Sequence, residues 1–106
     1  MSLVLDIGMG HRISYYGWHP DRDLNPQYAD RPDIDRVGIR IEHLRPDGEG
    51  DCVGAVTFDL PGAELFANDN HRWTVESWDP LTISPSVLCL RCGDHGFIRG
   101  GRWVTA

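Results

Sequence analysis

Lysine is missing from this 106-residue sequence, in which all ten basic residues are arginines. The α-amino group is therefore the only amine open to acylation. Basic residues are also outnumbered: the sequence has 16 acidic residues and ten arginines, so its formal net charge is −6. Phosphate contacts need a positive face, so this charge balance argues against a general nucleic-acid-binding protein.

Long apolar runs are also absent, so we expect no membrane-spanning segment. The first residues lack a basic region followed by an apolar core, so we expect no secretory signal and a cytoplasmic location. Cysteines number only three, an odd count that does not suit a disulfide framework and favours metal binding or free thiols. With 41% hydrophobic and 25% charged residues, the composition is typical of a soluble globular protein, and we expect residues 1–106 to form one domain.

Alternation of apolar and polar residues predicts a mostly β fold: a small antiparallel sheet or partly open barrel with one short helix. Val37–Leu44 and Cys52–Phe58 flank a turn rich in Pro and Gly at residues 45–50, which predicts an antiparallel hairpin. Cys52 should lie on its core face. Other predicted extended segments are Leu3–Ile7, Arg12–Trp18, Arg72–Trp78 and Leu81–Ser84, and the predicted helix is Pro61–Asn68.

Residues 19–36 differ from the rest, because three prolines and five aspartates disfavour regular structure. We expect a long acidic loop. Its segment Asp21–Asn25 imitates the start of a calcium loop, but Pro26 and Pro32 replace the glycine and glutamate that such a loop requires. A solvated surface loop is the preferred interpretation.

The C-terminal segment Leu81–Val104 has the outline of a metal-knuckle hairpin, with Cys89, Cys92 and His95 between two extended runs. In such a turn, backbone N–H groups point at the sulfurs, and Gly93 has no Cβ to crowd them. Thiolate and imidazole predict one zinc ion, which needs a fourth ligand. We expect this ligand to be His71; the alternatives are Cys52, His43 or a water molecule. A plain turn with two thiols and an exposed histidine would give the same pattern.

Several other functions fit residues of this segment. A hydrolase could use Ser86 as nucleophile with His95 as base, or Cys92 with His95. A metallohydrolase would keep an open metal position and could use Glu76 as its carboxylate. A nucleic-acid-binding knuckle would use a basic patch of Arg91, Arg99 and Arg102, with Phe97 and Trp103 available for stacking.

Residues 70–104 resemble an uncharacterised family of small bacteriophage and bacterial proteins. The shared tail here consists of Leu81–Ser86, Cys92, His95, Phe97–Ile98 and Gly100–Gly101, with Trp78 upstream. Some relatives carry the label ammonia monooxygenase, which this chain does not support, because it has no membrane-embedded or copper-site features. The resemblance implies an origin in phages of actinobacteria. For bacterial members it implies a place beside ubiquitin-like conjugation genes and a peptidase role.

Together these features predict a zinc-stabilised phage accessory protein that binds a host or viral protein partner, in the host cytoplasm or in the virion. The main alternative is a metallohydrolase or peptidase, and nucleic-acid binding is a third. Four protein ligands would indicate a structural metal, whereas three ligands and a water beside Glu76 would indicate a catalytic one.

Overall fold

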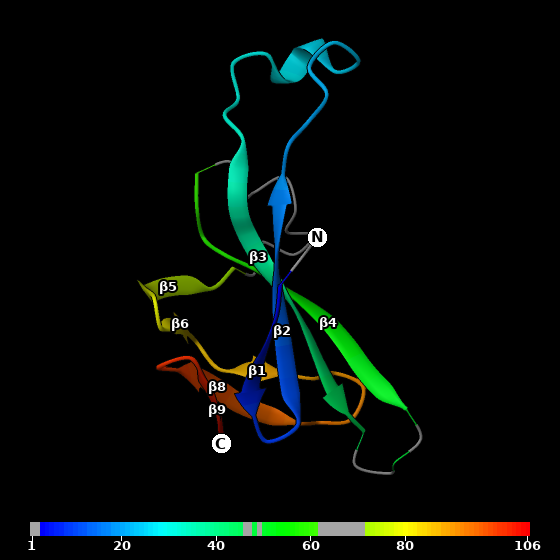
Figure 1. The fold of residues 1–106 in the computed structure, drawn as a ribbon, viewed down its shortest axis with the longest axis vertical. Coiled ribbons are helices and arrows are strands. Elements are labelled where there is room, and N and C mark those ends of the chain that lie inside the picture. Colours follow the sequence, from blue (N-terminus) through cyan, green and yellow to red (C-terminus); the bar gives the residue numbers. More distant parts are fainter. Residues whose placement is uncertain (1–2, 46–47, 49, 62–71) are drawn as a thin grey trace.

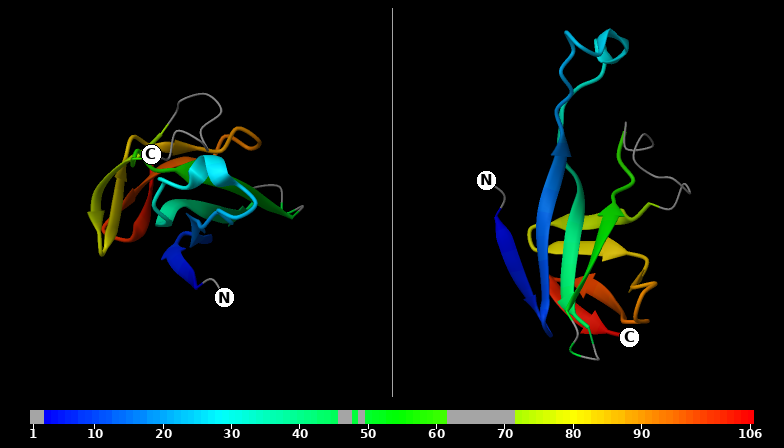
Figure 2. Two further views of the ribbon diagram at one scale, coloured as in Figure 1. Left: turned by 90° about the horizontal axis from the view of Figure 1, so that it is seen from above. Right: turned by 90° about the vertical axis from the view of Figure 1, so that its right-hand side faces the viewer.

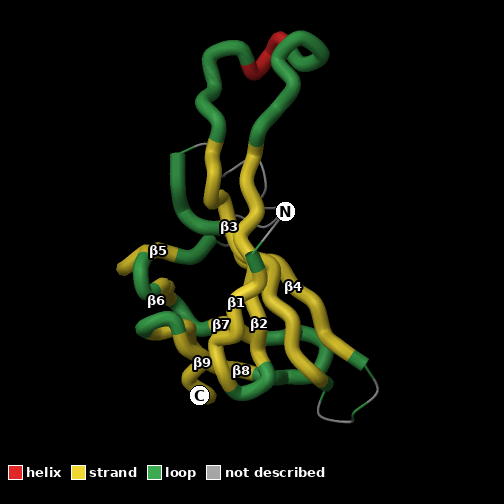
Figure 3. The backbone as a smooth tube through the Cα atoms, viewed as in Figure 1, coloured by secondary structure: helices red, strands yellow, loops and turns green. Residues whose placement is uncertain are grey.

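The protein is described here from a computed structural model, which covers residues 3–45, 48, 50–61 and 72–106. The described chain is mostly β, as the sequence predicts, and its regular structure is almost entirely strand (Figure 3). Its single described helical turn is the 3₁₀ segment η1, Pro26–Tyr28. No helix among the described residues is long and apolar enough to cross a membrane. The expected helix Pro61–Asn68 falls almost wholly outside the described residues.

Nine described strands form three antiparallel sheets (Figure 1). The first sheet has the order β1-β2-β3-β4, the second pairs β5 with β6, and the third has the order β7-β8-β9. The strands of the first sheet are β1 (Val4–Gly8), β2 (His11–Trp18), β3 (Ile34–Leu44) and β4 (Asp51–Thr57). The remaining strands are β5 (Thr74–Trp78), β6 (Leu81–Ser84), β7 (Val87–Leu88), β8 (His95–Arg99) and β9 (Arg102–Thr105).

The predicted hairpin of residues 37–58 is confirmed as β3 and β4. Its turn is closed by two backbone hydrogen bonds, from Arg45 N–H to Gly50 O (2.9 Å) and from Gly48 N–H to Arg45 O (2.9 Å). The register pairs His43 with Cys52. Residues directly opposite in an antiparallel pair direct their side chains to the same face, so this imidazole and this thiol are neighbours.

The acidic segment 19–36 forms an arm that extends from the body of the protein (Figures 1 and 2). β3 begins at Ile34, two residues earlier than the loop was predicted to end. Within the arm, Asp21 Oδ1 accepts hydrogen bonds from the backbone N–H groups of Asp23 (3.0 Å) and Leu24 (3.3 Å). This carboxylate therefore closes a local turn, as aspartate commonly does at loop starts.

The core lies where the inner face of the first sheet meets the two C-terminal sheets (Figure 2). Alternate residues of each strand point to this side, which is why Ile39 and Ile41 of β3 are buried while Arg40, between them, is exposed. Cys52 lies on the same face, as expected. The buried cluster comprises Ile7, Ile13, Ile39, Ile41, Val56, Phe58, Leu81, Ile83, Val87, Ile98 and Trp103.

Candidate functional site

The turn between β7 and β8 is a thiol-bearing knuckle at residues 89–94. Cys89 N–H donates to Asp94 O (2.8 Å), and Gly93 N–H donates to Cys89 O (2.8 Å). Gly93 has a φ of 79°, a left-handed conformation that a residue without Cβ adopts freely. The backbone N–H groups of Arg91 and Cys92 point at the Cys89 sulfur. The knuckle geometry predicted for this segment is therefore present.

Four donor atoms from the knuckle and the β3–β4 hairpin converge at one point. His43, Cys52, Cys89 and Cys92 place one nitrogen and three sulfurs within 4.8 Å of one another. His43 Nε2 lies 3.8 Å from Cys92 Sγ. Tetrahedral zinc, with Zn–S and Zn–N bonds of about 2.3 and about 2.0 Å, separates such ligands by about 3.6 Å. The cluster can therefore hold a metal ion, and its three-cysteine, one-histidine donor set is that of structural zinc sites.

Hydrogen bonds fix the orientation of the His43 ring. Its Nδ1 lies 3.1 Å from the carbonyl oxygen of Leu44, which can only accept a hydrogen bond. Nδ1 therefore carries a proton, and Nε2 faces the thiols, where its N–H stabilises the Cys89 thiolate in the metal-free chain and its lone pair would be available to a bound metal ion. This arrangement is the usual support of a metal-bound histidine.

The three thiols differ in their electrostatic surroundings. Burial acts to raise the pKa of Cys89, but the His43 imidazole and the N–H groups of Cys92 and Arg91 outweigh it and lower this pKa to about 6. Burial, followed by the neighbouring Cys89 and Cys92, raises the pKa of Cys52 to about 11. Because thiolate rather than thiol binds metal, Cys89 is more readily available as a ligand than Cys52, whose raised pKa opposes the loss of its proton.

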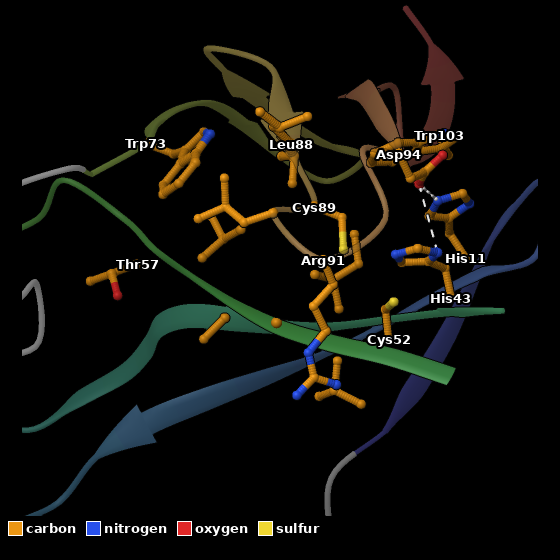
Figure 4. Close-up of a pocket in the computed structure, with 17 residues that line it drawn as sticks. His11, His43, Cys52, Thr57, Trp73, Leu88, Cys89, Arg91, Asp94 and Trp103 are labelled. Carbon is orange, nitrogen blue, oxygen red and sulfur yellow. Dashed lines mark hydrogen bonds and ion pairs between the residues drawn. The ribbon is translucent and has the colours of Figure 1, made fainter. Parts of the chain in front are cut away.

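A second group of side chains, His11, Asp94 and Trp103, packs beside His43 and supports this cluster. His11 Nε2 lies 2.6 Å from Asp94 Oδ2, and its Nδ1 lies 2.8 Å from Met9 O. The His11 ring is stacked on Trp103 at 4.0 Å between centroids and on His43 at 5.1 Å. Asp94 Oδ2 is also 3.8 Å from His43 Nδ1 (Figure 4). The knuckle is thereby tied to the turn between β1 and β2.

His95, expected to be the third ligand, is not brought to the thiols. It is the first residue of β8, and its Nε2 lies 2.7 Å from Ser86 Oγ. The β7–β8 register pairs Val87 with Gly96 and Leu88 with His95, which makes Ser86 and His95 diagonal neighbours on one sheet face. Three residues after Cys92, the chain has already left the knuckle and entered the strand. His43 supplies the imidazole of the cluster instead.

The described structure does not bring the other predicted site residues to the thiols. His71, the expected fourth ligand, is outside the described residues. Glu76 is exposed on β5 and does not line the cavity beside the thiols. Arg99 lies over the Phe97 ring at 4.2 Å and pairs in register with Arg102, whereas Arg91 is on the knuckle.

A cavity of about 520 Å³ lies between β4 and the β7–knuckle segment (Figure 4). At one end, the sulfurs of Cys52 and Cys89 gather beside the His43 ring. At the other end lies Trp73, whose indole N–H donates to the backbone oxygen of Ser86 (3.2 Å). The thiol cluster and the Ser86–His95 pair therefore lie at different ends of one short segment, β7.

A family model described as "Bacterial ubiquitination-like system serine protease (BubE)" matches residues 51–106. The match includes Ser86, His95 and the three cysteines. Curated relatives are Striatin-4 of Mus musculus and Striatin-4 of Homo sapiens, which are 28% and 27% identical over 88% of this chain. The chain spans about 13% of the length of these relatives. No solved structure matches.

Proposed function

The chain belongs to the family of bacterial ubiquitination-like system serine proteases, and from this premise we propose that it is a serine protease with Ser86 as nucleophile and His95 as general base. The observation that carries the proposal is the 2.7 Å separation of Ser86 Oγ and His95 Nε2. A nucleophile within hydrogen-bond reach of a base is the arrangement that covalent catalysis needs. Ser86 is half-buried and His95 is exposed, so a polypeptide can approach both.

The geometry supports the following sequence of steps. Ser86 Oγ attacks the scissile carbonyl carbon while its proton moves to His95 Nε2. The tetrahedral intermediate collapses, the C–N bond breaks, and His95 gives the proton to the leaving amine. Water then attacks the acyl ester with His95 again as base, which releases the acid and restores Ser86. The Trp73 indole holds the backbone of the nucleophile through its hydrogen bond to Ser86 O.

We propose that the metal ion of the cysteine cluster is zinc and that its role is structural. Cys52, Cys89, Cys92 and His43 would supply all four ligands of a zinc ion, which would leave no position for a catalytic water. When bound, zinc would crosslink the knuckle to the β3–β4 hairpin. β7 is only two residues long and lies between Ser86 and Cys89, so a fixed knuckle keeps Ser86 opposite β8 and His95.

This proposal replaces two alternatives that the sequence left open. A metallohydrolase would need an open metal position near Glu76, but this carboxylate is exposed on β5 away from the cavity. A purely binding role for an accessory protein has less support than proteolysis, because the matched family is described as a protease family. The protein partner expected from the sequence is, in this proposal, the polypeptide substrate from a ubiquitination-like system.

Labelling with a fluorophosphonate, which forms a covalent bond with activated serines, tests the assignment. We expect one label per chain at Ser86, located by peptide mass spectrometry. Ser86→Ala should abolish labelling, and His95→Gln should slow it by about 10²–10⁴-fold. The matched control is Ser84→Ala, two residues earlier, which should be labelled at the wild-type rate. Absence of labelling in the folded, zinc-loaded wild type would refute the proposal.

A further inference from the structure

The cavity beside the thiol cluster has a wall whose hydrogen-bonding groups are unused in the described structure. β4 is an edge strand of its sheet. Phe58 N–H donates to Val37 O, and the antiparallel register then alternates along β4. The backbone N–H and C=O groups of residues 58, 56, 54 and 52 therefore point toward β3. The backbone groups of Val53 and Ala55 therefore point away from β3. Among the described residues, Trp73 pairs with this edge only farther along, at Thr57 O and Asp59 N–H.

The floor of the cavity is open because residue 54 has no side chain. A Cβ built on Gly54 would meet only Ile41 Cγ2, at 3.8 Å, an ordinary van der Waals contact. Gly54 lies on the same face of β4 as Cys52, two residues away, and that face lines the cavity. The space over this glycine is therefore available to a side chain of another molecule.

The opposite wall exposes apolar side chains. Leu88 and Leu90 line the cavity with 51% and 92% of their surface exposed, and Val53 on the β4 side is 49% exposed. Arg91 also lines the cavity and extends from the knuckle across β4 (Figure 4). An apolar groove beside a free strand edge suits an extended polypeptide, which offers backbone hydrogen bonds and alternating side chains.

The groove ends next to the serine–histidine pair. Val87 lines it and directly follows Ser86, and Trp73 at its end donates to Ser86 O. Leu88 lies two residues after Ser86 in an extended segment, so the two side chains point to the same side of the chain. A chain lying along β4 would thus bring one of its peptide bonds to the nucleophile.

We propose that the groove between β4 and β7 binds the substrate segment next to the scissile bond, as an extended strand added to the edge of β4. The inference rests on the proposed protease function and identifies its substrate as a flexible, extended chain with small or apolar side chains. The backbone groups of Val53 and Ala55 would pair with the substrate, Gly54 would receive a side chain, and Leu88 and Leu90 would cover the segment.

Two substitutions block the groove without disturbing the sheet. Gly54→Leu fills the floor, where the added Cβ has room. Ala55→Pro removes a backbone N–H that points away from β3. An edge strand tolerates proline at such a position, because no hydrogen bond to β3 is lost. The control is Val4→Leu on β1, the opposite edge of the same sheet. Zinc content and circular dichroism should match wild type in all three variants.

The test uses a combinatorial decapeptide library, from which the best-cleaved peptide is selected. We expect each groove variant to raise the KM for this peptide by about tenfold, because Gly54→Leu occupies the space of a substrate side chain and Ala55→Pro removes one hydrogen bond to the substrate. The rate of labelling by the small fluorophosphonate should not change, because that probe needs only Ser86 and His95. If both variants have the wild-type KM, the groove does not bind the substrate, and the protease assignment is unaffected.

A binding measurement separates the two hypotheses completely. Amide chemical shifts of the Ser86→Ala chain, titrated with the same library, should change at Val53, Ala55 and Leu88, and Gly54→Leu should abolish these changes. If the shifts change at these residues but the wild-type chain cleaves no peptide, the groove remains as a peptide-binding site and the proposed protease function is wrong. No shifts, or shifts confined to other residues, would reject the groove.

Discussion

His43 and Cys52 lie directly opposite each other on β3 and β4, and both side chains are buried against the knuckle. This single register places two of the four donors of the metal cluster. It also connects the β3–β4 hairpin with the segment that carries Ser86 and His95. The stability of the knuckle and the geometry of the serine–histidine pair therefore depend on the pairing of His43 with Cys52, more than thirty residues earlier in the chain.

The donor set predicts which residues are needed to retain metal. Elemental analysis of purified protein should find about one zinc per chain. Cys52→Ser and His43→Ala should each lose most of it, because each removes one of four converging donors. His95→Ala should keep it, because His95 is engaged with Ser86. Loss of zinc in His95→Ala with retention in Cys52→Ser would favour the ligand set first expected from the sequence.

Removal of the metal should abolish the activity of Ser86 indirectly. Chelator treatment should lower the free energy of unfolding by several kcal/mol, since structural zinc contributes about 10–16 kcal/mol of binding energy in zinc-finger peptides. Fluorophosphonate labelling should fall in parallel, because β7 loses its anchor. Labelling should return with added zinc but not with magnesium, which prefers oxygen ligands. Unchanged labelling in the metal-free chain would contradict a structural coupling.

Thiol alkylation of the metal-free chain should depend on pH in a residue-specific way. The pKa of Cys89 is lowered to about 6, so its thiolate, and with it the alkylation rate, should be present at pH 7 and disappear as the pH falls through 6. The pKa of Cys52 is raised to about 11, so this buried thiol should resist alkylation until the pH approaches that value. Iodoacetamide labelling followed by mass spectrometry measures both profiles. Faster reaction of Cys52 than of Cys89 at pH 7 would contradict the described environment.

The contact between buried His11 and half-buried Asp94 should contribute to stability. Asp94→Asn weakens a 2.6 Å contact to a nearly buried imidazole, and we expect the free energy of unfolding to fall by roughly 2 kcal/mol. Urea denaturation measures this loss. Asp59→Asn is the control, because its 3.5 Å contact with Arg72 is made by a largely exposed carboxylate and should be worth less than about 0.5 kcal/mol. Equal effects of the two substitutions would show that burial does not strengthen the Asp94 contact.

Local patterns predicted the strands and the knuckle well. The hairpin of residues 37–58 follows from alternation on either side of a Pro/Gly turn, and the turn at Cys89–Gly93 follows from cysteine spacing. The same hairpin held an unused signal for the ligands, because a turn centred between residues 47 and 48 places His43 opposite Cys52. Short sequence spacing instead points to His95, whose side chain the β7–β8 register directs toward Ser86.

The sequence by itself determined the elements whose causes are local: alternating strands, turns that need glycine or proline, and a thiol pair separated by two residues. Only the tertiary structure decided which imidazole meets those thiols and which serine meets His95. Both are contacts between different strands, and their distances depend on strand register and sheet packing, which combine residues that lie far apart along the chain.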